Sequence, residues 1–214
     1  LYAGEEKITK YIDMPLQHIN DRMLKRMHRL GDRAAIESLV DRIRTRIPMV
    51  TFRTAFIVGF PGETDAAYTE LRDYVERAEF DRVAVFLYSD EEGTGAVGLD
   101  EKVERDVMDE RRNEILSIQE SISAAKGRAK VGSILEVLVD GRSEETEHVL
   151  EGRHEGLAPE IDGVVYLDED PSDTTSRHPA RQHGSSPTPG DFCTVEITDA
   201  AAFDLVGRIV TTPV

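Results

Sequence analysis

The chain has 214 residues, enough for one large domain or for two smaller ones that each bury a core. Its 42 acidic and 26 basic residues give a formal net charge of −16, which excludes a basic protein that coats nucleic acid by phosphate attraction. No apolar run approaches the ~20 residues that cross a bilayer, and we expect a cytoplasmic protein. The single cysteine, Cys193, excludes a disulfide framework and an all-cysteine metal site within this chain.

Residues 1–126 alternate between strand-like and helix-like patterns, which predicts an α/β fold. Near-continuous apolar content in the second and third strands favours burial on both faces, as in a parallel sheet. The expected strands cover 11–16, 51–58 and 82–88, and the expected helices begin after Asn20 or Asp21, at Asp32, after the turn Gly59–Gly62, and near 101, the last of them ending near 126.

The pattern changes at Gly127, and residues 127–214 read as a second, all-β domain. Asp140 and Gly141 are typical of a turn, and residues 168–190 are almost free of apolar side chains, which predicts a flexible loop between strands. Five short strands in one domain favour a small β-barrel. The expected strands cover 134–139, 146–151, 163–167, 192–197 and 204–210.

Polar or glycine-rich segments follow three successive strands. The segment Phe56–Thr64 passes from a strand into a helix, and its glycines allow a tight turn and a close approach to a ligand. Gln17 and His18 follow the first strand, and Tyr88–Thr94 follows the third. Because ligands of α/β folds bind at the carboxyl ends of strands, the three segments are candidates for one site. Each also has a plainer interpretation: an ordinary turn, a structural histidine at His18, and a solvated acidic loop at Asp90–Glu92, which could instead hold a cation.

Three further residue types invite a chemical interpretation. Arg53 lies inside an apolar strand and needs a partner, either a bound carboxylate or a neighbouring acidic residue. Cys193, within a strand-like run, is interpreted as a buried core residue rather than as a nucleophile or a metal ligand. His178 and His183 have no companion ligand at metal spacing, and we expect them to be free.

Four segments together resemble a known family, the radical S-adenosylmethionine methylthiotransferases. They are Tyr-Ile-Asp-Met-Pro-Leu-Gln-His at 11–18, Phe-Ile-Val-Gly-Phe-Pro-Gly-Glu-Thr at 56–64, Phe-Leu-Tyr-Ser-Asp-Glu-Glu-Gly-Thr at 86–94 and Ala-Pro-Glu-Ile-Asp-Gly-Val-Val-Tyr at 158–166. The last segment is similar to the family's C-terminal TRAM barrel. Within the family, the Pro-Leu-Gln-His and Tyr-Ser-Asp-Glu-Glu-Gly-Thr runs are most similar to the RimO type, which methylthiolates an aspartate of a small-subunit ribosomal protein.

The resemblance implies a fold and a set of cofactors. The chain would be the later part of a radical-SAM (β/α) partial barrel, residues 1–126, followed by a TRAM-like β-barrel, residues 127–214. One 4Fe-4S cluster would reduce S-adenosylmethionine to a 5′-deoxyadenosyl radical, and a second would take part in sulfur transfer. The resemblance assigns S-adenosylmethionine contacts to six residues: Gln17, Arg53, Ile57, Gly59, Phe86 and Tyr88.

The chain also departs from the family pattern. It has no three-cysteine motif and begins with Leu1, so we interpret it as a C-terminal fragment of a longer enzyme. We assign it no catalytic residue and no metal ligand, and we expect it to be inactive alone because cluster assembly needs cysteine thiolates. An incomplete barrel would also leave strand edges unpaired, which favours self-association.

The charge distribution favours one substrate class over another. Residues 127–214 hold 17 acidic and seven basic residues, a net −10 of the chain's −16. Such a barrel would repel RNA and suit a basic ribosomal protein. Salt adaptation, which the scarcity of lysine (six, against 20 arginines) also fits, would weaken that inference. A transfer-RNA methylthiotransferase of the MiaB type and a non-enzymatic TRAM-type binding module remain as alternatives.

Overall fold

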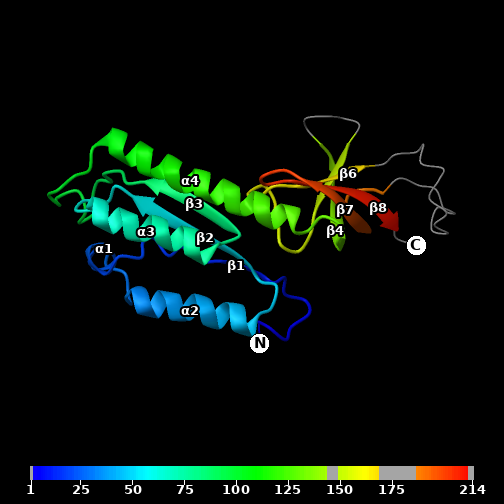
Figure 1. The fold of residues 1–214 in the computed structure, drawn as a ribbon, viewed down its shortest axis with the longest axis horizontal. Coiled ribbons are helices and arrows are strands. Elements are labelled where there is room, and N and C mark those ends of the chain that lie inside the picture. Colours follow the sequence, from blue (N-terminus) through cyan, green and yellow to red (C-terminus); the bar gives the residue numbers. More distant parts are fainter. Residues whose placement is uncertain (1, 144–148, 169–186, 212–214) are drawn as a thin grey trace. The chain divides into compact units, whose positions relative to one another are not determined.

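The computed structural model describes residues 2–143, 149–168 and 187–211 (Figure 1). Their contacts divide them into two compact units, Leu1–Ile122 and Ser123–Val214. Helix α4, Arg105–Arg128, begins in the first unit and ends in the second. Among the described residues, no helix is both long enough and apolar enough to cross a bilayer.

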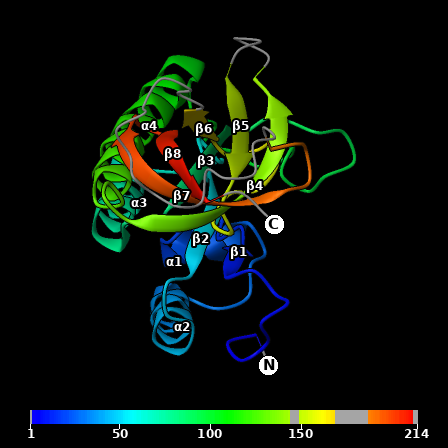
Figure 2. The same ribbon diagram turned by 90° about the vertical axis from the view of Figure 1, so that its right-hand side faces the viewer.

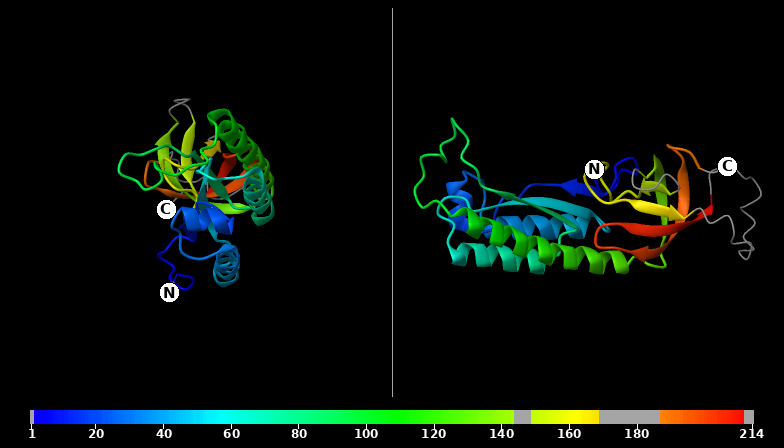
Figure 3. Two further views of the ribbon diagram at one scale, coloured as in Figure 1. Left: turned by 90° about the vertical axis from the view of Figure 1, so that its left-hand side faces the viewer. Right: turned by 90° about the horizontal axis from the view of Figure 1, so that it is seen from above.

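The first unit is built on a parallel sheet with the strand order β1-β2-β3. The strands are β1 (Tyr11–Asp13), β2 (Thr51–Val58) and β3 (Arg82–Leu87), and the helices before α4 are α1 (Asp21–Arg26), α2 (Arg33–Arg46) and α3 (Asp65–Ala78). Strand and helix alternate along the chain, and α3 and α4 run side by side (Figures 1 and 3). The predicted α/β class is confirmed.

Local side-chain signals explain where the first three helices begin. The side chains of Asn20, Asp32 and Thr64 each accept a hydrogen bond from the backbone N–H three residues on, which satisfies a donor that has no partner within the helix. Helix α4 begins at Arg105, later than the predicted 101. Glu101 has a left-handed backbone (φ 64°), and its carbonyl accepts a hydrogen bond from the Gly62 N–H at 2.8 Å, so this stretch forms tertiary contacts before the helix starts.

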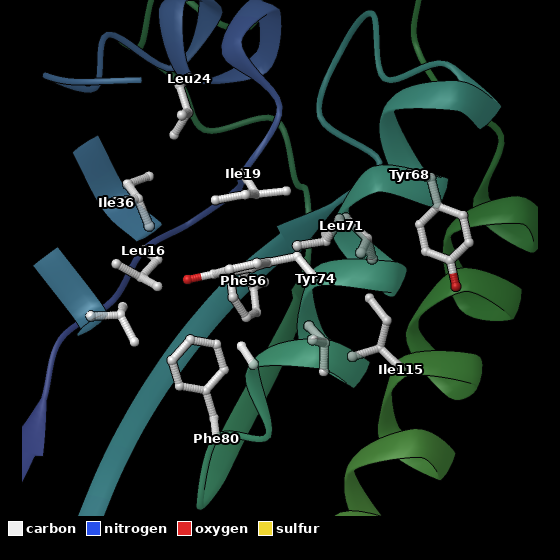
Figure 4. Packing of buried hydrophobic residues seen from close by; sticks show 14 of the residues in the cluster. Leu16, Ile19, Leu24, Ile36, Phe56, Tyr68, Leu71, Tyr74, Phe80 and Ile115 are labelled. Atoms are coloured by element: carbon white, nitrogen blue, oxygen red, sulfur yellow. The ribbon is translucent and has the colours of Figure 1, made fainter. Parts of the chain in front are cut away.

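The core of the first unit lies between the sheet and its helices (Figure 4). Phe52, Phe56 and Val58 on β2 are fully buried, and they belong to one cluster with side chains from α2, α3 and α4. The prediction that the strands are buried on both faces is wrong for β3, where Phe86 remains 57% exposed. The physical reason is that the helices pack against the sheet face that carries Phe52, Phe56 and Val58, and β1 and β3 each pair with a single strand among the described residues.

The second unit is a closed barrel with the strand order β4-β5-β6-β8-β7 (Figure 2). The strands are β4 (Ile134–Arg142), β5 (Leu150–Arg153), β6 (Val165–Asp168), β7 (Phe192–Ala200) and β8 (Leu205–Thr211). Alternate residues of each strand point inward, and small aliphatic side chains such as Val137, Val195 and Ile197 fill the interior. The predicted β-barrel is confirmed, and Cys193 lies buried in its core, as expected.

Two details of the barrel differ from expectation or fall outside the structure. The predicted turn at Asp140–Gly141 is wrong: β4 continues to Arg142, and the register shifts between Val139 and Gly141, as in a β-bulge. Residues 146–148 of the predicted second strand lie outside the described residues. So does 169–186, which is most of the predicted loop and includes His178 and His183.

Candidate functional site

The ends of the three parallel strands lie side by side at one edge of the sheet. Past β1, the Gln17 N–H donates to the Ala55 carbonyl at 2.8 Å, and the Gln17 carbonyl accepts from the Ile57 N–H at 2.9 Å. Past β3, the Tyr88 N–H donates to the Val58 carbonyl at 3.0 Å. Main-chain hydrogen bonds therefore hold the three segments singled out in the sequence next to one another.

An apolar surface adjoins this edge on the sheet face away from the core. Ile57 pairs in register with Phe86, and their side chains share the face opposite the buried Phe56. Ile57 is half-buried, and Phe86 is exposed. Together with Gln17 and Tyr88, they place apolar and polar groups within one small region, which we call the strand-end site.

Arg53 does not join this region. It lies four residues before Ile57 on the same strand, about 13 Å away at ~3.3 Å per residue. Its Nη1 forms an ion pair with the Asp13 carboxylate at 2.5 Å, and the two residues are partners in the β1–β2 register. Of the two partners considered for Arg53, the structure shows the neighbouring acidic residue.

The turn that follows β2 requires glycine at both of its glycine positions. Gly59 has a φ of 78°, and a Cβ built there would lie 2.3 Å from the Met108 Cγ. Gly62 has a φ of 86°, and a Cβ there would lie 2.9 Å from the Arg26 Nε. A side chain at either position would be strained by both backbone conformation and space, so the turn holds one closely packed conformation.

Tyr88 is held in place by its neighbours at the end of β3. Its hydroxyl donates to the Asp90 carboxylate at 2.7 Å, and the Lys102 ammonium binds the same carboxylate and lies 5.0 Å from the centre of the Tyr88 ring. Burial and the hydrogen bond to Asp90 both raise the pKa of Tyr88, and the hydrogen bond from Lys102 lowers the pKa of Asp90. Asp90 is therefore paired with Lys102, whereas Glu91 and Glu92 are exposed.

His18 is a structural histidine, as the plainer interpretation held. The side chain is fully buried, and its Nδ1 accepts hydrogen bonds from the backbone N–H groups of Ile19 and Asn20 at 2.9 and 3.0 Å. Because Nδ1 accepts, the ring proton lies on Nε2, which donates to the Glu63 carboxylate at 3.1 Å.

Glu63 and Arg111 form a buried ion pair to which the sequence analysis assigned no role. The Arg111 Nη1 donates to Glu63 Oε2 at 2.6 Å, and the Gly59 N–H donates to the same oxygen at 2.8 Å. Glu63 stands within a segment already singled out, but Arg111 is one of several arginines of α4. Its partner is 48 positions away, so no local pattern could have identified it.

The residues of this chain do not fit an iron–sulfur cluster. Such a cluster needs several thiolate ligands, and Cys193 is the only cysteine. It lies inside the barrel, where burial raises the pKa of its thiol. Within the described ranges, no three His, Cys, Asp or Glu side chains gather as they would around a metal ion.

Comparison with known proteins accounts for both units. A TRAM domain family model matches residues 131–210. "Ribosomal protein uS12 methylthiotransferase RimO" from Anaeromyxobacter sp. (strain K) is 47% identical over 208 residues, which are 97% of this chain and 41% of the relative. The proteins of the same name from Sorangium cellulosum and Myxococcus xanthus are 46% and 41% identical, over 98% and 99% of this chain and 40% and 41% of their own lengths.

The chain thus spans about two fifths of the length of the curated relatives that it matches. Among solved structures, coproporphyrinogen III oxidase (HemN) from Escherichia coli, described as a radical SAM enzyme, matches with a TM-score of 0.44 and 18% identity. That match covers 57% of this chain and 28% of the other, and we base no conclusion on it. Nearly the whole chain is thus similar to a part of proteins named uS12 methylthiotransferase RimO, and its barrel, at residues 131–210, matches a TRAM domain.

Proposed function

We propose that this chain is part of a cytoplasmic enzyme that methylthiolates an aspartate of a small-subunit ribosomal protein. The observation that carries the proposal is the 41–47% identity, over nearly the whole chain, to relatives named as uS12 methylthiotransferases. In this proposal the first unit binds S-adenosylmethionine and the barrel binds the protein substrate. The chain itself supplies no cluster ligand and is inactive alone.

The strand-end site suits S-adenosylmethionine chemically. A purine ring can lie against the apolar surface of Ile57 and Phe86, because one is half-buried and the other exposed at the same sheet edge. Gln17 and Tyr88 supply polar groups beside it, because main-chain hydrogen bonds hold both next to β2. Arg53 would bind the polar end of the cofactor only by exchanging Asp13 for it.

In such an enzyme S-adenosylmethionine, together with a reduced cluster, supplies the radical chemistry. The residues of this chain have a different task, which is to bind and orient the cofactor. The cluster ligands would come from cysteines outside these 214 residues.

The charge of the barrel supports a protein substrate. Residues 127–214 carry a net −10, and a ribosomal protein that binds RNA is basic, so the two attract each other at long range. Transfer RNA, with a phosphate at every nucleotide, would be repelled by the same surface. The proposal therefore favours the RimO-type substrate over the MiaB-type substrate.

The test uses the complete gene product with its clusters reconstituted without oxygen. We expect three cysteines spaced Cys-x₃-Cys-x₂-Cys upstream of residue 1, and we expect mass spectrometry to find one methylthio group on an aspartate of the small-subunit ribosomal protein. Modification of transfer RNA instead would replace the substrate that we propose. Absence of those upstream cysteines would favour the non-enzymatic binding module.

A further inference from the structure

One carboxylate in the first unit, that of Glu63, is fully buried at the centre of a polar network. The side chains of Glu63 and His18 are 0% exposed and that of Arg111 is 7% exposed. Glu63 uses both oxygens: Oε1 binds His18 at 3.1 Å, and Oε2 binds both Arg111 at 2.6 Å and the Gly59 N–H at 2.8 Å. Charges this deeply buried are costly unless they are fully paired, and every contact of Glu63 is directional.

These contacts connect segments of the chain whose relative positions determine the geometry of the strand-end site. His18 directly follows Gln17 in the segment past β1, and Gly59 directly follows Val58, the last residue of β2. Glu63 therefore ties two of the three strand ends to each other, and Arg111 ties both to α4. The network is next to the site but does not line it, because all three side chains are buried.

Arg111 is held more rigidly than a simple ion pair requires. Its Nη2 binds the exposed Asp65 carboxylate at 2.6 Å while Nη1 binds the buried Glu63, and the guanidinium lies 5.1 Å from the centre of the Tyr68 ring. Two charged partners and an aromatic face fix the plane of the guanidinium. A lysine could keep the charge but could not reach both carboxylates with this geometry.

A purely stabilising pair would not need the Gly59 N–H. That amide belongs to the turn, where Gly59 has a φ of 78° and its backbone polar group is buried. An apolar replacement of Glu63 would leave this donor without a partner at the point where the cofactor should approach. The position of Glu63 thus sets the conformation of the turn, and Arg111 sets the position of Glu63.

We propose that Arg111 is a positioning residue for the strand-end site: acting through Glu63, it fixes the Gly59 turn and the Gln17–His18 segment in the conformation that binds S-adenosylmethionine. This inference rests on the proposed function, because it names the cofactor of that function. It assigns no chemical step to Arg111, which does not touch the cofactor.

The experiment measures S-adenosylmethionine binding to the complete, cluster-loaded gene product. The variants are Arg111→Met, Arg111→Lys, Glu63→Gln and the double variant Arg111→Met with Glu63→Gln. Arg105→Met is the matched control, since Arg105 lies on the same helix and its pair with Asp109 is exposed. The dissociation constant, the KM and kcat of the reaction and the thermal midpoint are recorded for each.

We expect Arg111→Met to raise the dissociation constant about tenfold and Arg111→Lys to raise it about threefold, because small displacements of binding groups weaken binding strongly. Arg105→Met should leave it unchanged. When Glu63→Gln is already present, adding Arg111→Met should raise the dissociation constant by less than about a further twofold. The reason is that Arg111 acts on the site only through its contact with Glu63. KM for S-adenosylmethionine should rise more than kcat falls, which lower stability alone does not produce.

The outcomes separate the inference from the function on which it rests. If the unsubstituted protein fails to bind S-adenosylmethionine, the proposed function falls and the inference falls with it. If that protein binds and Arg111→Met binds equally well, or if the effects of Arg111→Met and Glu63→Gln multiply independently, only the inference is overturned. If Arg111→Met does not fold, Arg111→Lys decides: binding equal to that of the unsubstituted protein rejects the inference.

Discussion

The two units of the chain fill their cores with different chemistry. The first buries His18, Glu63 and Arg111 beside the strand-end site, whereas the buried polar side chains described in the second are the two serines Ser123 and Ser143. Ser123 lies on α4, and the core cluster described for the barrel consists of aliphatic side chains and Cys193. A charged core is costly unless its contacts are complete, and it holds one geometry when they are.

The difference indicates where each unit carries its function. In the first unit, buried charges lie directly behind the candidate site, so the interior shapes the site. In the barrel, the interior only needs to be filled, and the function that we propose places recognition on the outer surface. Substitutions inside the two cores should therefore have different consequences, and three of them test this.

The largest effect is expected for Glu63→Ala. It leaves Arg111 buried opposite Asp65 alone and removes the acceptor of the Gly59 N–H, so we expect a loss of about 4 kcal/mol in the free energy of unfolding. Denaturant unfolding followed by circular dichroism measures it. Glu196→Ala is the matched control in the barrel, because its pair with Arg208 is partly exposed and should contribute less than about 1 kcal/mol. Equal effects of the two substitutions would remove the contrast between the units.

A smaller loss, of about 3 kcal/mol, is expected for Ile197→Ala. Ile197 is 0% exposed in the barrel core, and truncation leaves a cavity without disturbing any polar contact of that side chain. Amide hydrogen exchange should quicken mainly in the barrel strands, and the affinity for S-adenosylmethionine should remain that of the unsubstituted protein. A large loss of affinity would show that the barrel core also shapes the cofactor site.

Features with local causes could be predicted from the sequence. Helices start where Asn20, Asp32 and Thr64 can accept a backbone hydrogen bond, and the apolar alternation of the barrel strands marks their inward residues. The candidate site could be located as well, because parallel strands bring their carboxyl ends to one edge. Each of these inferences needs only neighbouring residues and the handedness of the chain.

Features with tertiary causes could not be predicted. Asp140 and Gly141 are residues typical of a turn, but the pairing of β4 with β5 continues past them through a β-bulge. The partner of Arg53 became known only once the register placed Asp13 beside it. The ion pair of Arg111 with Glu63 forms because α4 packs against α3. The two residues are 48 positions apart, and no sequence periodicity relates positions at that distance.

The smallest effect is expected for Tyr74→Phe, and its sign is opposite. The Tyr74 hydroxyl is buried with no hydrogen-bond partner among the described residues, so its removal should stabilise the first unit by up to about 1 kcal/mol. Burial raises the pKa of Tyr74 from 10.0 to about 12. The unfolded chain therefore loses this proton first, and native stability falls as the pH rises from about 10 toward 12. Tyr74→Phe should flatten part of that decline, which denaturant unfolding at several alkaline pH values measures. An unchanged or steeper decline would mean that the hydroxyl has a partner in solution.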